Sequence, residues 1–198
     1  MEFKLWIKFR IFLYALGFFV FSIGIFGCSL VQHDLTDDPR LQNIANQCYE
    51  TQKDSLVYEI GCADITNSLI APRCLTIQAL GEPCLPETKE KFYADPEKWE
   101  KKMYRCGAAS RKKGIDVVSA GTQLKVTKIF STPGFELNRF WNITVIVQNG
   151  ELIDKELVLP VYSSANILGP KWFHPSRIYP SDELSVPEPD PQFLEACD

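Results

Sequence analysis

The most pronounced hydrophobic pattern of the chain is an uncharged apolar run near its start. Ile11–Phe26 has sixteen residues without a charge; it follows the basic segment Met1–Arg10 and precedes Gly27–Ser29. A basic segment, an apolar segment and small residues in this order are typical of an export signal. The uncharged stretch extends to Val31 and is long enough to cross about 30 Å of hydrocarbon. An uncleaved signal anchor is therefore the alternative.

Helical spacing predicts one clear helix, which begins at Asp95–Glu97. Asp can cap the first turn, Pro fits the first helical position, and Glu suits the positive end of the helix dipole. Trp99, Met103 and Cys106 then fall on one face. Gly107 fits the end of this helix.

Period-two alternation after Gly114 predicts strands. It is present at Leu124 and Val126 and again in Phe140–Gln148. Four apolar side chains of the second segment fall on one face: Trp141, Ile143, Val145 and Val147. Asn149–Gly150 predicts a tight type I′ turn, and a further strand is expected to return after it. Such closely spaced antiparallel strands favour a small barrel or a strongly twisted sheet.

The segments before these strands are less regular. Cys48–Thr51 and Ser55–Tyr58 predict two short strands, which form either a hairpin or one bent strand. Gly61–Pro86 holds three cysteines, three prolines and two glycines, which predicts a loop-rich region stabilised by disulfides. Within it, Ile65–Ile70 and Cys74–Leu80 are each expected to form one or two helical turns, and further along Thr132-Pro133-Gly134 predicts a turn.

The last thirty residues form a proline-rich tail, which excludes a long helix or a central strand. Its apolar side chains are expected to pack across the domain: Trp172, Phe173, Ile178 and Tyr179. Glu188–Pro191 is expected to be extended and exposed.

The sequence thus divides into a signal peptide (1–27), a polar tether (28–40) and one disulfide-stabilised α+β domain (41–198). The domain comprises a cysteine-rich helical and loop part (41–113), a β part (114–168) and the proline-rich tail (169–198). We expect a small antiparallel barrel or a twisted sheet with a helical, disulfide-rich insert.

The residues Ile25-Phe26-Gly27-Cys28 resemble the lipobox of bacterial lipoproteins, with Phe26 bulkier than usual. This resemblance implies that Cys28 becomes the mature N-terminus and carries a diacylglyceryl group and an N-acyl chain such as palmitate. Three acyl chains give stable membrane anchoring. Ser29 after the cysteine points to the outer membrane, with the domain in the periplasm.

Seven cysteines are present, and the lipid attachment at Cys28 explains the odd number. An oxidising compartment then favours three disulfides among the remaining six: Cys48, Cys62, Cys74, Cys84, Cys106 and Cys197. Fifteen pairings are possible. Because five of the six lie within Cys48–Cys106, we predict that Cys197 pairs back into this cluster. No spacing fits a metal site, and no cofactor is expected.

The charge distribution is uneven. The chain of 198 residues has 21 basic and 25 acidic residues; without residues 1–27, which carry three basic and one acidic, the net charge is −6. This gives no reason to expect nucleic-acid binding. Lys89–Lys113 has nine basic and four acidic residues. Its helix could face anionic lipid headgroups or an acidic partner, or simply a solvated surface with i,i+4 pairs such as Glu97–Lys101.

The run Ala120–Val126, followed by Trp141-x-Ile143-x-Val145 and Asn149–Gly150, resembles the middle of bacterial SH3-like barrels. Over these 45 or so residues, the resemblance implies an SH3-like barrel. The Arg-Ser-Gly-Pro turn and the terminal Gly-Trp-Val usual in that family are absent. A generic small sheet domain is the alternative.

No catalytic motif stands out. Ser110–Lys113 fits S-x-x-K without the motifs that accompany it in penicillin-binding proteins, and His174 has no identifiable nucleophile. The favoured hypothesis is therefore a non-enzymatic, lipid-anchored binding or assembly module of the envelope, with envelope proteins or peptidoglycan as partners. The candidate contact residues are Trp141, Lys98, Lys101, Lys102 and Arg105. The alternatives are a periplasmic enzyme with a site assembled from scattered residues and a signal-anchored inner-membrane subunit.

Overall fold

A computed structural model describes residues 32–61, 73–105, 114–133, 139–159, 171–174, 177–178 and 186–197. These residues belong to one compact unit, Gln32–Asp198. The lipobox-like segment, Cys62 and Cys106 lie outside the described residues, so the predictions made for them stay predictions. Neither helix in the described ranges is long and apolar enough to cross a membrane.

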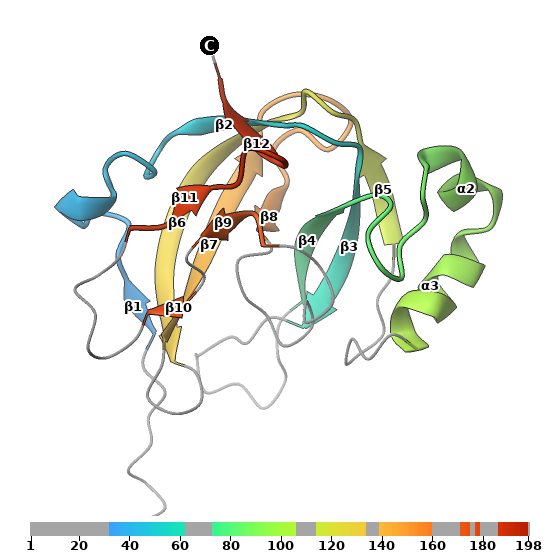
Figure 1. The fold of residues 1–198 in the computed structure, drawn as a ribbon, viewed down its shortest axis with the longest axis horizontal. Coiled ribbons are helices and arrows are strands. Elements are labelled where there is room, and N and C mark those ends of the chain that lie inside the picture. The colour runs from blue at the N-terminus through green and yellow to red at the C-terminus, as the bar shows by residue number, and fades with distance from the viewer. Residues whose placement is uncertain are drawn as a thin grey trace, which may run out of the picture. The chain divides into compact units, whose positions relative to one another are not determined.

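The unit is an α+β fold made mostly of sheet (Figure 1). Its elements are β1 (His33–Asp34), the 3-10 helix η1 (Pro39–Leu41), β2 (Cys48–Thr51), β3 (Ser55–Gly61), β4 (Arg73–Ala79), α2 (Lys89–Ala94), α3 (Pro96–Arg105), β5 (Gly114–Val118), β6 (Gln123–Pro133), β7 (Arg139–Val147), β8 (Glu156–Val158), β9 (Phe173–His174), β10 (Arg177–Ile178), β11 (Glu188–Pro189) and β12 (Leu194–Ala196).

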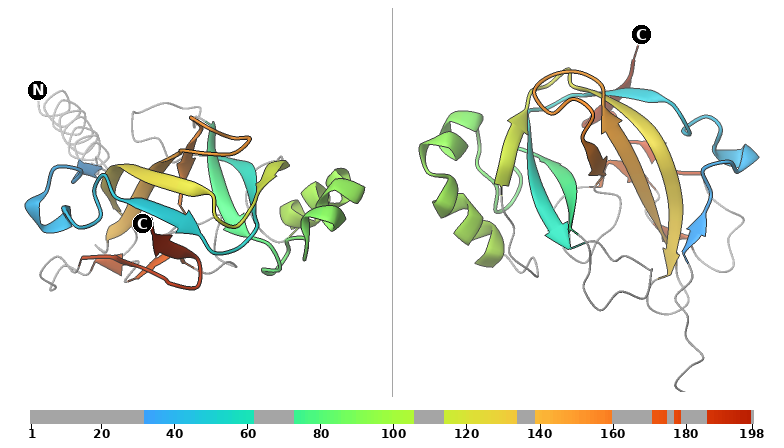
Figure 2. Two further views of the ribbon diagram at one scale, coloured as in Figure 1. Left: turned by 90° about the horizontal axis from the view of Figure 1, so that it is seen from above. Right: turned by 180° about the vertical axis from the view of Figure 1, so that it is seen from behind.

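One curled, open sheet contains most of these strands, in the order β12-β2-β6-β7-β8-β4-β3-β5. The short strands β1 and β10 add to β6 and β7, and β9 pairs with β11 in a separate ribbon. The pairs are antiparallel except for β4 with β8. Figure 2 shows the curl from above, with the two helices beside the end of the sheet that carries β3 and β5. The sheet is a half-barrel, and it does not confirm the SH3-like form.

The predicted meander from β6 to β8 is confirmed. Leu124, Val126 and Ile129 of β6 are fully buried. Their spacing changes from two to three because a bulge lies between Val126 and Lys128, where the register with β7 shifts. In β7 the predicted face is fully buried. β6 continues to Pro133. Thr132 and Pro133 therefore belong to the strand and not to the turn predicted at Thr132–Gly134.

Cys48–Thr51 and Ser55–Tyr58 do form strands, but these do not pair with each other, so the hairpin alternative is wrong. β2 pairs with β6 and β12, whereas β3 pairs with β4 and β5. The chain therefore crosses from one half of the sheet to the other between these two strands. At the crossing, Asp54 Oδ1 accepts a hydrogen bond of 2.9 Å from the backbone N–H of Ala120.

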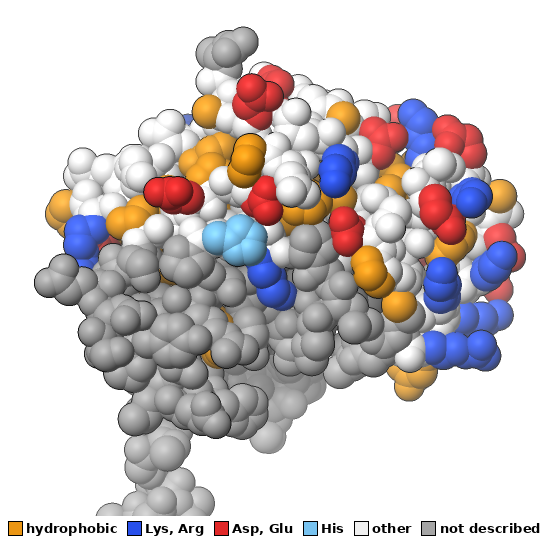
Figure 3. Space-filling view, viewed as in Figure 1, with side chains coloured by type: hydrophobic (Ala, Val, Ile, Leu, Met, Phe, Trp, Pro, Cys, Tyr) orange, Lys and Arg blue, Asp and Glu red, His pale blue; other side chains and the backbone are white. Residues whose placement is uncertain are grey.

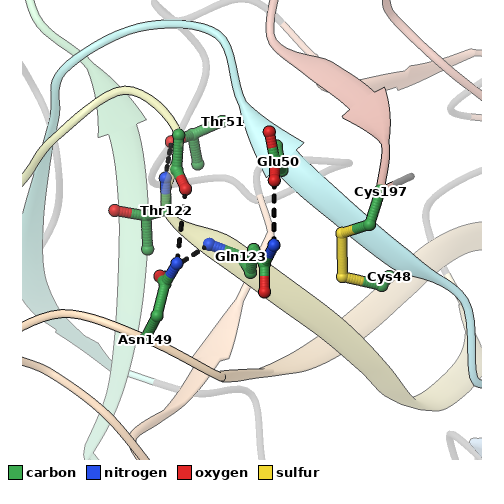
Figure 4. Close-up of a disulfide and its surroundings, with 8 residues drawn as sticks. Cys48, Glu50, Thr51, Thr122, Gln123, Asn149 and Cys197 are labelled. Atoms are coloured by element: carbon green, nitrogen blue, oxygen red, sulfur yellow. Dashed lines mark hydrogen bonds between the residues drawn. A yellow bond between two sulfur atoms is a disulfide. The ribbon is translucent and has the colours of Figure 1, made fainter.

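Two predictions of local structure are wrong. Cys74–Leu80 is not helical: it contains most of strand β4, which has a strand on each side. The connection after β7 is not a two-residue turn, because Asp154 N donates to Val147 O across a longer loop. Asn149 instead contacts the turn between β5 and β6, where its Oδ1 accepts from Gln123 N at 2.9 Å (Figure 4).

The residues assigned to a polar tether also differ from expectation over their described part. His33 pairs with Ser131 in the β1–β6 ladder, and Ile129 N donates to Thr36 Oγ1 at 3.0 Å. Residues 32–40 are thus part of the domain. Strand β1 has only two residues, which is too short for an alternation of polar and apolar residues to predict it. It is a strand because it pairs with β6.

The core has two parts. The main core lies against β2, β6 and β7 and includes Trp141. The tail contributes Trp172 and Phe173, both fully buried, so their predicted packing across the domain is confirmed. Of the segment expected to be extended and exposed, Glu188–Pro189 forms β11, whereas Pro191 begins a turn.

Candidate binding surface

Two short helices, α2 and α3, form a helical arm at the β5 end of the sheet. Thr88 caps α2, because its Oγ1 accepts from Lys91 N at 3.4 Å. Asp95 caps α3 as predicted: its Oδ1 accepts from Lys98 N at 3.0 Å, with Pro96 in the first helical position. Each cap satisfies a backbone N–H that the first helical turn leaves without an acceptor, so the sequence fixes where α3 begins.

A second hydrophobic core holds the arm on the outer face of β3. It contains Leu56, Tyr58, Leu85, Phe92, Trp99 and Met103. Trp99 Nε1 donates to Lys91 O at 2.9 Å and so joins α3 to α2. Burial raises the pKa of Tyr58, whose hydroxyl donates to Gln78 Oε1 at 3.0 Å. Because Trp99 and Met103 are buried, the orientation of α3 on the sheet is fixed.

The charges of α3 are segregated by this orientation. At about 100° per residue, its four cations fall within an arc of about 100°: Lys98, Lys101, Lys102 and Arg105. Glu100 falls outside this arc together with Tyr104, which is 59% exposed, whereas Glu97 lies only about 40° from Lys101. We call the four cations the basic face of α3. Basic side chains gather over the helices in Figure 3.

The contacts of the basic face leave its charges at the surface. Lys101 Nζ lies 3.7 Å from Glu97 Oε2, an ion pair between two exposed side chains, which confirms the predicted i,i+4 pair. Lys102 Nζ lies 4.5 Å and Lys98 Nζ 5.8 Å from the centre of the Trp99 ring. Arg105 is exposed in the last turn of the helix, where a cation is favoured by the helix dipole.

The structure therefore brings together four of the five predicted contact residues and separates the fifth. Trp141 is fully buried in the main core. It cannot contact a partner in this fold, so the prediction of Trp141 as a contact residue is wrong. Its indole N–H has no acceptor among the described residues.

Two features of the arm were not anticipated. The aromatic ring beneath Lys98 and Lys102 follows from their spacing on either side of Trp99, at i−1 and i+3, so the sequence did carry that signal. The hydrogen bond from the Tyr93 hydroxyl to Asp116 Oδ1 joins α2 to β5. It raises the pKa of Tyr93. Nothing local predicts this bond, because it depends on how the arm packs.

The second residue with candidate chemistry is His174. Its Nε2 lies 3.5 Å from Asp190 Oδ2, and its side chain is 58% exposed. Asp190 directly follows β11, whose Glu188 pairs with His174 in the β9–β11 ribbon. Asp182 and Glu183, the carboxylates near His174 in sequence, lie outside the described residues. Within the described ranges, no hydroxyl donates to His174, and no three metal-ligating side chains come together.

Four of the six cysteines expected in disulfides are confirmed as bonded. Cys197 is joined to Cys48, so the prediction that it pairs back into the cysteine cluster is also confirmed. Cys74 and Cys84 are disulfide-bonded as well.

Comparisons of the chain with protein-family models, curated proteins and solved structures gave no match.

Proposed function

We propose that this protein is an exported, lipid-anchored component of the bacterial cell envelope, and that its domain is a binding or assembly module. The observation that carries the proposal is the disulfide bonding of four cysteines, Cys48, Cys74, Cys84 and Cys197. Disulfides persist in oxidising compartments such as the periplasm. Together with the lipobox-like Ile25–Cys28, they support export followed by acylation of Cys28.

The binding surface in this proposal is the basic face of α3. The helix is held by its buried residues Trp99 and Met103 and by the hydrogen bond from Trp99 to Lys91 O. The cations therefore project from a rigid support rather than from a loop. A rigid support reduces the conformational entropy that the binding surface loses when a partner binds. The partner is a component of the envelope, such as an envelope protein or peptidoglycan. Ser29 after Cys28 favours the outer membrane as the place of the anchor, with the domain facing the periplasm.

The SH3-like resemblance belongs to this proposal only as a description of the fold. Of its residues, Gln123–Val126 begin β6, and Trp141 lies in β7. Folds of that type carry many unrelated functions. The resemblance therefore adds nothing to the choice of partner.

The enzyme alternative has one observation in its favour, the pair formed by His174 and Asp190. A general base also needs a nucleophile or a water in hydrogen-bond reach. His174 is largely exposed on a two-stranded ribbon, where water would compete with a substrate. This setting supports a binding module better than an enzyme.

The lipid anchor is tested with the full chain expressed in a bacterial host that is fed an alkyne-labelled fatty acid. We expect label on the wild-type protein and on the control Ser29→Ala, and none on Cys28→Ser. Mass spectrometry of the mature N-terminus should give an acylated Cys28. An unmodified Met1, or label retained by Cys28→Ser, would overturn the proposal; the former result would favour the signal anchor.

A further inference from the structure

We infer that the basic face of α3 docks on an anionic phospholipid surface. The inference rests on the proposed function, because a lipid-anchored protein stays next to such a surface. It goes further, since it assigns a lipid partner to four named residues: Lys98, Lys101, Lys102 and Arg105.

The first argument is the separation of charge on α3. The helix has four cations and two acids, Glu97 and Glu100. Glu100 lies about 100° around the helix from the nearest cation, whereas Glu97 lies beside the basic face and pairs with Lys101. A flat anionic surface can therefore reach Lys98, Lys102 and Arg105 without facing a carboxylate of α3. Lys101 is the only cation of the face with an ion pair in the described part of the chain, and that pair is exposed and long. Such a pair is weak and can be exchanged for a phosphate.

The second argument is what the basic face lacks. Tight protein–protein interfaces centre on aromatic or other large side chains that bury themselves in the partner. The aromatic residue next to these cations, Trp99, is only 6% exposed and is already covered by Lys102. A lipid headgroup layer needs no such anchor, because each cation near its surface contributes independently. The basic face fits a lipid surface better than a protein.

The sequence after α3 adds charge of the same sign. Arg111, Lys112 and Lys113 follow α3 without an intervening acid. Lipid recognition by basic clusters requires about four to eight cations. The basic face alone reaches this range.

The test uses the unit Gln32–Asp198, which contains both cores and the Cys48–Cys197 bond and carries no acyl chain. Its binding is measured by co-sedimentation with phosphatidylcholine vesicles, with and without one third phosphatidylglycerol. We expect binding to the anionic vesicles only. Raising the salt from about 0.1 M to about 1 M shortens the Debye length from about 10 Å to 3 Å and should abolish it.

The test variant is Lys101→Gln/Arg105→Gln, which leaves the cations over Trp99 in place. Each lost charge should weaken partitioning roughly fivefold, so the pair should lose about 25-fold. The control Lys125→Gln/Lys155→Gln removes the same charge from exposed positions outside the arm and should change partitioning less than about twofold. Circular dichroism and the unfolding midpoint show that each variant is folded.

Absence of binding to anionic vesicles, or an equal loss in both double variants, would overturn the lipid assignment. The fatty-acid labelling of Cys28 is independent of this result. Labelling without vesicle binding would keep the anchored protein and point to an acidic protein partner instead. Vesicle binding without labelling would keep the lipid surface and reject the anchor.

Discussion

Cys197, the second-last residue, is disulfide-bonded to Cys48 at the start of β2, 149 residues earlier, with their Cα atoms 5.4 Å apart (Figure 4). The same contact includes hydrogen bonds. β12 pairs with β2, where Leu194 lies opposite Thr51, and Cys197 N donates to Cys48 O at 3.1 Å. The end of the chain is therefore held in the sheet by a covalent bond as well as by a strand ladder.

Replacing both cysteines, as in Cys48→Ala/Cys197→Ala, should lower the free energy of unfolding by about 3–5 kcal/mol. In the chain-entropy model, a closed loop of this length restricts the unfolded chain by about 5 kcal/mol, and the pairing of β12 remains in the variant. Urea unfolding measures the change, with intact mass confirming that the other disulfides are formed. A loss below about 1 kcal/mol would contradict this account of the bond.

The tail should also contribute through the stacked rings of Trp172 and Phe193, whose centres are 5.7 Å apart. Trp172→Ala should destabilise the fold by about 3–5 kcal/mol, because it leaves a cavity in the main core. Trp172→Phe should cost clearly less, since it keeps a ring on Phe193. It also removes an indole N–H that is buried without an acceptor among the described residues. Equal losses in the two variants, measured by urea unfolding, would contradict the packing described.

The sequence predicted those elements in which one face is buried and the other is not. β7 and α3 are of this kind, and their periods of two and 3.6 were visible. β4 is different, because Thr76, Ile77, Gln78 and Ala79 are all buried, with a core on each side. In the sequence, Leu75, Ile77 and Ala79 nevertheless alternate with Thr76 and Gln78, which is the period of a strand. The helical prediction for Cys74–Leu80 missed this short alternation.

The sequence predicted the part of the candidate site that depends on neighbouring residues of one helix, and it missed what depends on contacts far along the chain. The four cations of α3 share a face because helix geometry alone places them there. Trp141 was misplaced because its burial depends on tail residues that join the same core, among them Phe173. The bend between β2 and β3 likewise depends on partners far along the chain.

Asn149 gives a local test of one such distant contact. Asn149→Ala should destabilise the fold by about 1–2 kcal/mol, because Gln123 N loses its acceptor at the start of β6. Asn149→Asp is the matched control, since it keeps an oxygen at that position and should retain most of the stability. Amide hydrogen exchange at Gln123 should become faster in the alanine variant. Unchanged exchange there would show that the contact does not protect the turn.

The carboxylate of Asp38 should titrate at unusually low pH. The Arg40 guanidinium donates two hydrogen bonds to it, from Nε at 2.9 Å and Nη2 at 2.6 Å. Its backbone N–H adds a third, also at 2.9 Å. These bonds lower the pKa of Asp38 from 3.8 to about 2, with the side-chain bond as the largest cause.

Because the pKa is lower in the folded state, the unfolded chain binds a proton more readily. The stability from this group is therefore fully present above pH 3.8 and is lost as the pH falls through about 2. Arg40→Gln keeps the backbone N–H and removes the guanidinium, so the pKa of Asp38 should rise toward 3.8. A carboxyl-detected NMR titration of both proteins measures this. A wild-type midpoint near 3.8, or no rise in the variant, would mean that the pairing does not persist in solution.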